Sequence, residues 1–89
     1  MESVGRLAAF MDGPLQRDLS ALPGIGDQGI KILAKLEITT MDQLLGKFLM
    51  LDRDVDKMLA WCEEHRVGGA RFAETVVHAL AMKAHRLLD

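Results

Sequence analysis

The chain has 89 residues, of which 49% are apolar and 27% charged, and its formal net charge is −2. This length and composition predict one small globular domain, and the negative charge argues mildly against nucleic acid without excluding it, because binding depends on a local basic patch. The single cysteine, Cys62, excludes an internal disulfide framework. No apolar run approaches the ~18 residues of a membrane span, and no signal peptide is expected.

The N-terminal third of the chain predicts two short helical stretches ahead of a longer helix. Ser3 is suited to cap a first helix, which Gly13-Pro14 ends. Residues 18–22 predict a single helical turn that stops before a proline. Asp27 has the residue type and the position expected of an N-cap for the helix that follows.

Capping signals also mark the later helices. Thr40, with Gln43 three residues on, predicts a capping box, and Asp54 predicts a side-chain cap. Gly68-Gly69 is a stop signal ahead of the last helix. The expected helices of this region cover about residues 41–51, 54–65 and 70–88. No strand-like alternation appears, so the sequence predicts an all-α fold, a small compact helical bundle with a single domain over residues 1–89.

The stretch LPGIG, from Leu22 to Gly26, stands directly before a helix and has two glycines where an ordinary turn needs one. Bare N–H groups at a helix start suit a phosphate, because glycine has no Cβ to hold it off. Lys31 and Lys35 lie four residues apart on the following helix and would add charge. This pattern is typical of a helix-hairpin-helix, here at about residues 18–36, which contacts the nucleic-acid backbone and not the bases. A packing turn without a ligand is the alternative.

The helix MDQLLGKFLML, residues 41–51, has apolar side chains on more than one face. A surface helix of a monomer buries one face, so this helix is expected to contact both its own core and a partner. Gly46 in its interior costs about 1 kcal/mol relative to alanine, which indicates a close backbone approach. We expect self-association through this helix. The alternative is a central helix buried on all sides of a monomer.

No catalytic or metal-binding constellation is recognisable in the sequence. Cys62 and His65 could share a helix face, but two ligands do not make a zinc site. The carboxylates of Asp52 and Asp56 are typical of capping and solvated charge. Trp61 is expected in the core, and an interface anchor is the alternative. We therefore expect a protein that is not an enzyme and holds neither a metal nor a cofactor.

Several of these features occur together in one known family. The length, the LPGIG turn, the segment Leu44–Leu51 and the following Trp61 resemble the barrier-to-autointegration factor family, small chromatin proteins of animals. The resemblance covers nearly the whole chain, including Phe10, Pro14 and Gly68. Its most specific part is the order of leucine, glycine, phenylalanine and leucine in Leu44–Leu51. The likeness is that of a diverged relative.

The resemblance implies a compact helical homodimer with a helix-hairpin-helix in each subunit. Each subunit would hold the backbone of one duplex, so that the dimer bridges two segments of double-stranded DNA without sequence preference. A chromatin-associated protein of the nucleus or cytoplasm is implied as well. The residues expected to contact DNA are Arg6, Gly24, Ile25, Gly26, Gln28, Gly29, Lys31, Ala70 and Arg71. The expected dimer contacts are Leu45, Gly46, Leu49 and Met50.

Some positions depart from the family pattern. Glu74 and Ile32 stand where the family has basic residues, and Asp18 replaces another ahead of the turn. These replacements weaken the electrostatic attraction for DNA. Val4 stands where the family has a regulatory serine, so control by phosphorylation at that position does not carry over.

Family dimers also bind the LEM domains of inner-nuclear-membrane proteins in a groove between the subunits. Met50 and Trp61 match that surface, whereas Lys57 replaces an apolar residue and Asp52 replaces a lysine. LEM-domain or lamin-type partners are therefore a weaker expectation than DNA.

Two functions stay open at this point. The intact glycine turn favours a DNA-bridging dimer. The acidic replacements favour a dimeric protein-interaction module with weak or no DNA binding, which would pair as a heterodimer with a more basic paralogue. A titration with duplex DNA at two salt concentrations separates the two.

Overall fold

The computed structural model describes residues 8–11 and 13–89, and this part of the chain is helical without any strand. The all-α expectation is therefore confirmed. Residues 8–11 form a short helical segment. The elements that follow are the 3₁₀ helix η1 (Leu19–Ala21) and the α-helices α2 (Gly26–Lys35), α3 (Met41–Met50), α4 (Val55–His65) and α5 (Gly69–Leu88). No described helix has both the length and the apolar character to cross a membrane.

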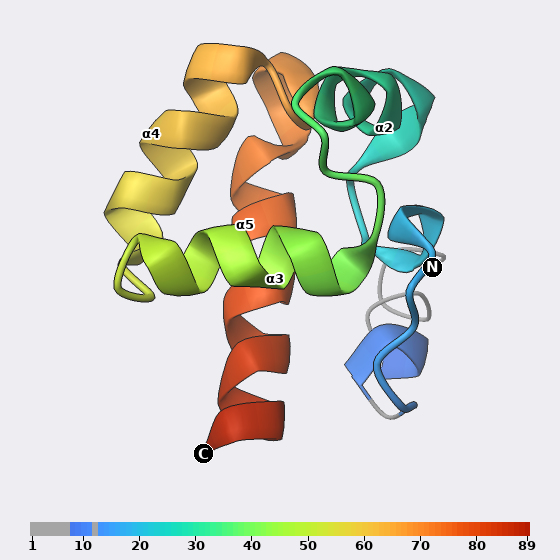
Figure 1. The fold of residues 1–89 in the computed structure, drawn as a ribbon, viewed down its shortest axis with the longest axis vertical. Coiled ribbons are helices and arrows are strands. Elements are labelled where there is room, and N and C mark those ends of the chain that lie inside the picture. Colours follow the sequence, from blue (N-terminus) through green and yellow to red (C-terminus); the bar gives the residue numbers. More distant parts are fainter. Residues whose placement is uncertain (1–7, 12) are drawn as a thin grey trace.

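The long helix α5 is the axis of the molecule (Figure 1). In this view α3 crosses α5 near its middle, while α4 and α2 lie on opposite sides of its first half. α4 runs antiparallel to α5 and makes the most extensive helix-helix contact in the described residues. The start of α5 lies at the same end of the molecule as α2, although the two segments are far apart in the sequence.

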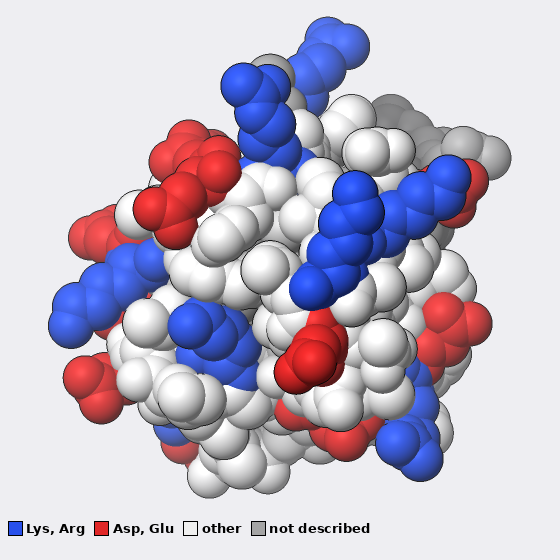
Figure 2. Space-filling view, turned by 45° about the horizontal axis from the view of Figure 1, so that its top comes forward, with Lys and Arg blue, Asp and Glu red and all other residues white. Residues whose placement is uncertain are grey.

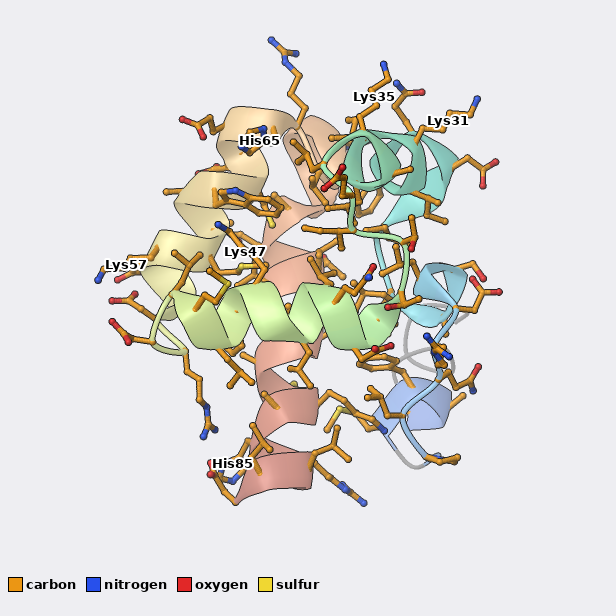
Figure 3. The ribbon with its side chains drawn as sticks, in the orientation of Figure 1. Lys31, Lys35, Lys47, Lys57, His65 and His85 are labelled. Atoms are coloured by element: carbon orange, nitrogen blue, oxygen red, sulfur yellow. The ribbon has the colours of Figure 1, made fainter. Side chains whose placement is uncertain are left out.

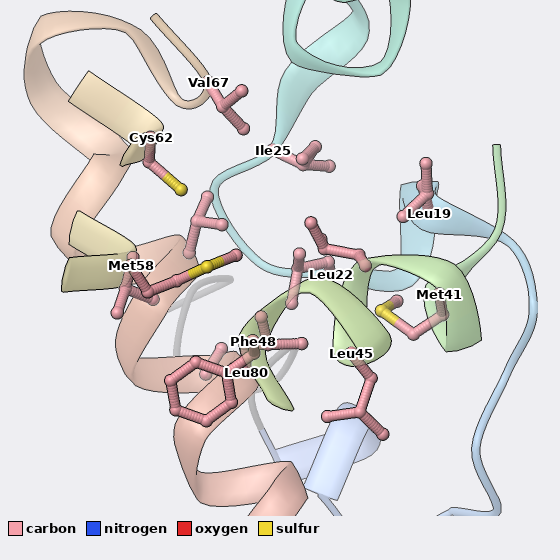
Figure 4. Packing of buried hydrophobic residues seen from close by; sticks show 14 of the residues in the cluster. Leu19, Leu22, Ile25, Met41, Leu45, Phe48, Met58, Cys62, Val67 and Leu80 are labelled. Atoms are coloured by element: carbon pink, nitrogen blue, oxygen red, sulfur yellow. The ribbon is translucent and has the colours of Figure 1, made fainter. Parts of the chain in front are cut away.

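The core draws on every labelled element. Figure 4 shows part of it, with side chains from η1, α3, α4 and α5 and from the turns between helices. Aliphatic and sulfur-containing side chains dominate it, and Phe10 and Phe48 are its only buried aromatic side chains among the described residues. The fully buried large apolar side chains include Leu22, Leu33, Met41, Leu44, Phe48, Met58, Val76, Val77 and Leu80.

The caps expected for α3 and α4 are confirmed. Thr40 Oγ1 accepts a hydrogen bond from the Gln43 backbone N–H at 3.3 Å, and Gln43 Oε1 accepts one from the Thr40 N–H at 3.2 Å, which completes the capping box. Asp54 Oδ1 accepts from the Lys57 N–H at 3.1 Å. These side chains satisfy donors that a helix start leaves without an intrahelical partner.

The cap expected at Asp27 is wrong. The N-cap lies two residues earlier, at Ile25, whose side chain makes no capping hydrogen bond, and α2 begins at Gly26. Gly26 has φ +66°, a conformation that glycine adopts without strain, and this sets the start of the helix. Asp27 therefore lies in the first turn, where its charge complements the positive helix end.

Two polar contacts fasten the C-terminal half of α5. Lys83 is 1% exposed, and its ammonium group donates to the backbone carbonyls of Gly13 at 2.6 Å, Phe10 at 2.7 Å and Met11 at 3.4 Å. It thereby closes the carbonyl end of the helical segment at residues 8–11. At the end of α5, Asp89 accepts two hydrogen bonds from Arg53, at 2.6 and 3.0 Å.

Candidate nucleic-acid interface

The LPGIG turn is anchored by its apolar residues and bent by its glycines. Leu22 and Ile25 are buried at 0% and 3% exposure, and Pro23 is buried as well. Gly24 and Gly26 have φ angles of +86° and +66°. The element before the turn is the three-residue helix η1, so the first arm of the expected helix-hairpin-helix is a single 3₁₀ turn.

The two glycines of this turn have different surroundings. A Cβ on Gly24 would lie 3.1 Å from Thr75 Cγ2 and 3.3 Å from Phe72 Cβ, so this glycine lets the turn pack against α5. A Cβ on Gly26 would meet no atom within 4 Å. Gly24 therefore fits the interpretation of a packing turn. Of the two glycines in this turn, Gly26 is the one that combines a left-handed backbone with open space that a ligand could enter.

The first turn of α2 presents unpaired donors beside this space. Helix geometry leaves the N–H groups of Gly26, Asp27 and Gln28 without intrahelical acceptors, and Ile25 supplies no side-chain cap. Gly29 is buried, and its missing Cβ would lie 3.5 Å from the backbone nitrogen of Gly68. Gly29 thus brings the first turn of α2 against the turn that precedes α5.

The start of α5 resembles that of α2 in its glycines, although its Gly69 N–H donates to the Arg66 carbonyl at 3.1 Å. Its N-cap, Gly68, has φ +86° and no side chain to cap the helix, and a Cβ there would lie 2.8 Å from the Ala73 nitrogen. Gly69 has φ +64°, and a Cβ on it would meet nothing within 4 Å. Because Gly29 lies against Gly68, two uncapped helix starts are adjacent. Their positive ends together form an environment that favours an anion.

Charged side chains around these helix starts have both signs. Lys31 and Lys35 extend from the outer side of α2 (Figure 3). Arg71 is exposed in the first turn of α5. Asp27 and Glu74 are exposed on the same two helices. On the face of Figure 2, Lys and Arg side chains lie in small groups, with acidic and uncharged residues between the groups. Backbone donors therefore supply much of the attraction for an anion here.

The expected DNA contacts do not all fall within the described residues. Arg6, like Ser3 and Val4, lies outside them, as does the side chain of Ala70. The remaining expected residues lie in the turn, in α2 or in the first turn of α5. They are Gly24, Ile25, Gly26, Gln28, Gly29, Lys31 and Arg71.

Sequence reasoning missed two residues of this region. Gly69 was interpreted as part of a stop signal, although its doublet with Gly68 also starts a helix with open space in front of it. Phe72 is 51% exposed beside Gly24 and was not singled out.

Asp18, which stands where the resembled family has a basic residue, has a structural role. Its carboxylate caps η1 by accepting a hydrogen bond from the Ser20 N–H at 2.9 Å, and this bond lowers the pKa of the carboxyl.

A second exposed surface lies on α3. Leu49 and Met50 are 43% and 78% exposed, and a Cβ on Gly46 would meet no atom within 4 Å. Leu45 is 8% exposed and belongs to the core of its own chain, so three of the four expected dimer contacts remain on the exposed face. Trp61 is half-buried beside this face, with Lys47 Nζ 5.2 Å from its ring centroid. Burial on all sides therefore does not describe α3 in the single chain.

The cysteine has the environment of a packing residue. Cys62 is fully buried, and burial raises the pKa of its thiol to about 11, so the thiol stays protonated at neutral pH. No group of three or more His, Cys, Asp or Glu side chains within the described residues is arranged to hold a metal ion.

Comparison with known proteins gives no relative: no family model matches the sequence, and no curated protein or solved structure is similar to the chain.

Proposed function

We propose that this protein binds double-stranded DNA through its phosphates, without sequence preference, and bridges DNA segments as a dimer. The observation that carries the proposal is the pair of adjacent helix starts at Gly26 and Gly69. Each begins on a glycine with positive φ, has no side-chain cap and opens onto free space.

The chemistry of these helix starts suits a phosphate. Backbone N–H groups at a helix N-terminus donate to phosphate oxygens, and the helix dipole adds a partial positive charge. Neither interaction distinguishes bases, so the contact positions the duplex without selecting a sequence. Arg71 and Lys31 add two exposed cations, while Asp27 and Glu74 oppose them. We therefore expect each subunit to neutralise about two to four phosphates, with modest affinity that falls as salt rises.

Dimerisation would provide the second DNA site. Gly46, Leu49 and Met50 offer an apolar face without a neighbour in the single chain, and the missing Cβ at Gly46 allows another backbone to approach. A helix-to-helix contact between two copies across this face would leave both pairs of glycine helix starts available. The partner is a second copy or a paralogue.

The second candidate function is a dimeric interaction module with weak or no DNA binding. The mixed charges around the glycine helix starts, with Asp27 and Glu74 exposed there, favour it. In that case the α3 face would still form a dimer, and the glycine helix starts would serve packing alone.

A bridging assay tests the proposal. Two unrelated duplexes of equal length, one with a donor and one with an acceptor fluorophore, are mixed with the protein at low salt. We expect equal affinity for both and energy transfer between them. Gly46→Glu places a charge in the dimer contact, so it should remove the energy transfer and make the protein sediment as a monomer.

The control for this assay is Ala60→Glu, which adds the same charge at an exposed position of α4 and should leave bridging intact. Strong preference for one duplex would contradict backbone recognition. A strictly monomeric wild-type protein would rule out bridging by a dimer.

A further inference from the structure

Phe72 has an unusual position for an exposed aromatic residue. It is 51% exposed, whereas Phe10 and Phe48 are buried and Trp61 is half-buried, so it is the only exposed Phe or Trp in the described residues. The other exposed large apolar side chains are aliphatic and lie on α3, after α2 or in the last two turns of α5: Leu36, Leu49, Met50, Met82, Leu87 and Leu88. A lone exposed apolar residue is common on protein surfaces, and what distinguishes Phe72 is its position.

Phe72 lies in the first turn of α5, against the LPGIG turn. Its N–H donates to the Gly68 carbonyl at 3.0 Å in the first turn of α5. Its Cβ would lie 3.3 Å from a Cβ on Gly24, so the LPGIG turn lies against its base. Side chains of a helix lean toward its N-terminus, which directs this ring toward the Gly68-Gly69 turn. A ligand held at both helix starts would therefore meet the phenyl ring.

The charge of this surface gives the ring a further role. Because acidic and basic side chains offset each other there, phosphate attraction alone supplies modest affinity. Many proteins that bind the minor groove of DNA insert an apolar side chain at a base step, which partly unstacks the bases and lets the bent duplex contact more of the protein. A phenyl group beside two phosphate-binding helix starts has the chemistry for such an insertion.

We propose that Phe72 acts as an apolar wedge that enters a base step of the bound duplex, which makes distorted or mismatched double-stranded DNA the preferred ligand. This inference rests on the proposed DNA binding. A mismatched duplex binds better because its bases are already partly unstacked and the wedge costs less to insert. The base sequence of a fully paired duplex changes the binding affinity much less than a mismatch does.

The test compares two neighbouring residues of the same helical turn. Affinity is measured for a paired duplex and for the same duplex with a central mismatch, over a range of salt concentrations. Phe72→Ala should weaken binding by about 5- to 100-fold at every salt concentration without changing the salt slope, because its contact involves no counterion release. It should also remove the preference for the mismatch. Arg71→Gln should instead make the slope shallower by about one and keep the preference.

Two further measurements identify the wedge itself. A duplex with 2-aminopurine should gain fluorescence when wild type binds and should not when Phe72→Ala binds. Phe72→Leu keeps an apolar wedge and should retain most of the affinity, whereas Phe72→Gln should behave like Phe72→Ala. Circular dichroism should be unchanged in all three variants, because the side chain is half exposed.

The outcomes separate this inference from the proposed function. If wild type binds duplex DNA and Phe72→Ala binds equally well, or changes the salt slope alone, the wedge is wrong and DNA binding stands. If wild type binds no duplex at low salt, the proposed function is wrong and the wedge falls with it.

Discussion

The helix ends of this molecule fall into two groups, closed and open. Side chains close the starts of η1, α3 and α4, through Asp18, Thr40 and Asp54, and Lys83 closes the carbonyl end of residues 8–11. We call the starts of α2 and α5 open, because they have no side-chain cap. Each begins on a glycine with positive φ, and the two starts lie against each other.

The comparison indicates that the open starts serve something besides stability. A side-chain cap contributes about 1 kcal/mol to a helix, and this sequence uses such caps at three other starts. The two starts without one are adjacent in space although about forty residues separate them in sequence. The Gly69 N–H is paired with the Arg66 carbonyl at 3.1 Å, so the unpaired donors at Gly26, Asp27 and Gln28 of α2 are those that suit a bound anion.

The largest effect on stability is expected at Gly68. Gly68→Ala would force a Cβ to 2.8 Å from the Ala73 nitrogen at φ +86°, and we expect the free energy of unfolding to fall by about 3 kcal/mol or more. Gly69 also has a positive φ, +64°, but a Cβ there would meet no atom within 4 Å. Gly69→Ala should therefore lower the free energy of unfolding by only about 1 kcal/mol. Urea denaturation of both variants measures the difference, and equal losses would contradict the packing described at Gly68.

The closed end at Lys83 should also matter for stability. Lys83→Met keeps the apolar stem but leaves the carbonyls of Phe10 and Gly13 without their donor, so we expect a loss of about 2–3 kcal/mol. Lys31→Met, on the exposed outer side of α2, should change stability by less than about 0.5 kcal/mol. Thermal unfolding of the two variants checks this, and a Lys83→Met protein as stable as wild type would show that the carbonyl contacts contribute nothing.

A smaller pair of substitutions separates stability from binding. Thr40→Ala removes a cap and should cost about 1 kcal/mol without changing DNA affinity. Gly26→Ala should cost a similar amount, about 1–2 kcal/mol for its positive φ, but should also weaken DNA binding because a methyl group would enter the open space. Denaturation and DNA titration of both variants are needed, and weakened binding in Thr40→Ala alone would reverse the assignment of open and closed ends.

The smallest effect concerns pH at the far end of α5. Hydrogen bonds from Arg53 and His85 hold the pKa of the Asp89 carboxyl well below its usual range. A carboxyl whose pKa is lower in the folded state than in the unfolded state stabilises the fold. This stabilisation is fully present above the unfolded-state pKa of about 4 and is lost as the pH falls from there toward the folded-state pKa. Melting temperatures should therefore fall less steeply below about pH 4 in Asp89→Asn than in wild type. Parallel curves for the two proteins would contradict this role of Asp89.

Local signals were predictable from the sequence, and contacts over long sequence distances were not. The capping box at Thr40 and the cap at Asp54 involve residues within three positions, so pattern alone identified them. Asp27 was misassigned because the left-handed backbone of Gly26 lets the helix start two residues earlier. The contact of Lys83 with Phe10 spans 73 residues and has no local signature.

The candidate site was predictable only in part for the same reason. LPGIG marked the start of α2, but its proximity to Gly68 follows from tertiary packing. Among the leucines of α3, sequence could not tell that Leu45 is buried in its own chain while Leu49 is exposed.

The most direct test of the account is a duplex-DNA titration at two salt concentrations with matched charge changes at an open and a closed helix start. Gly26→Glu adds a carboxylate at the open start of α2. Gln43→Glu adds one at the closed start of α3, where glutamate preserves the capping box. We expect a wild-type salt slope of about −2 to −4, no binding by Gly26→Glu, and wild-type binding by Gln43→Glu. A wild-type dimer that binds no duplex at low salt, or equal losses in the two variants, would contradict the assignment of the open helix starts to phosphate.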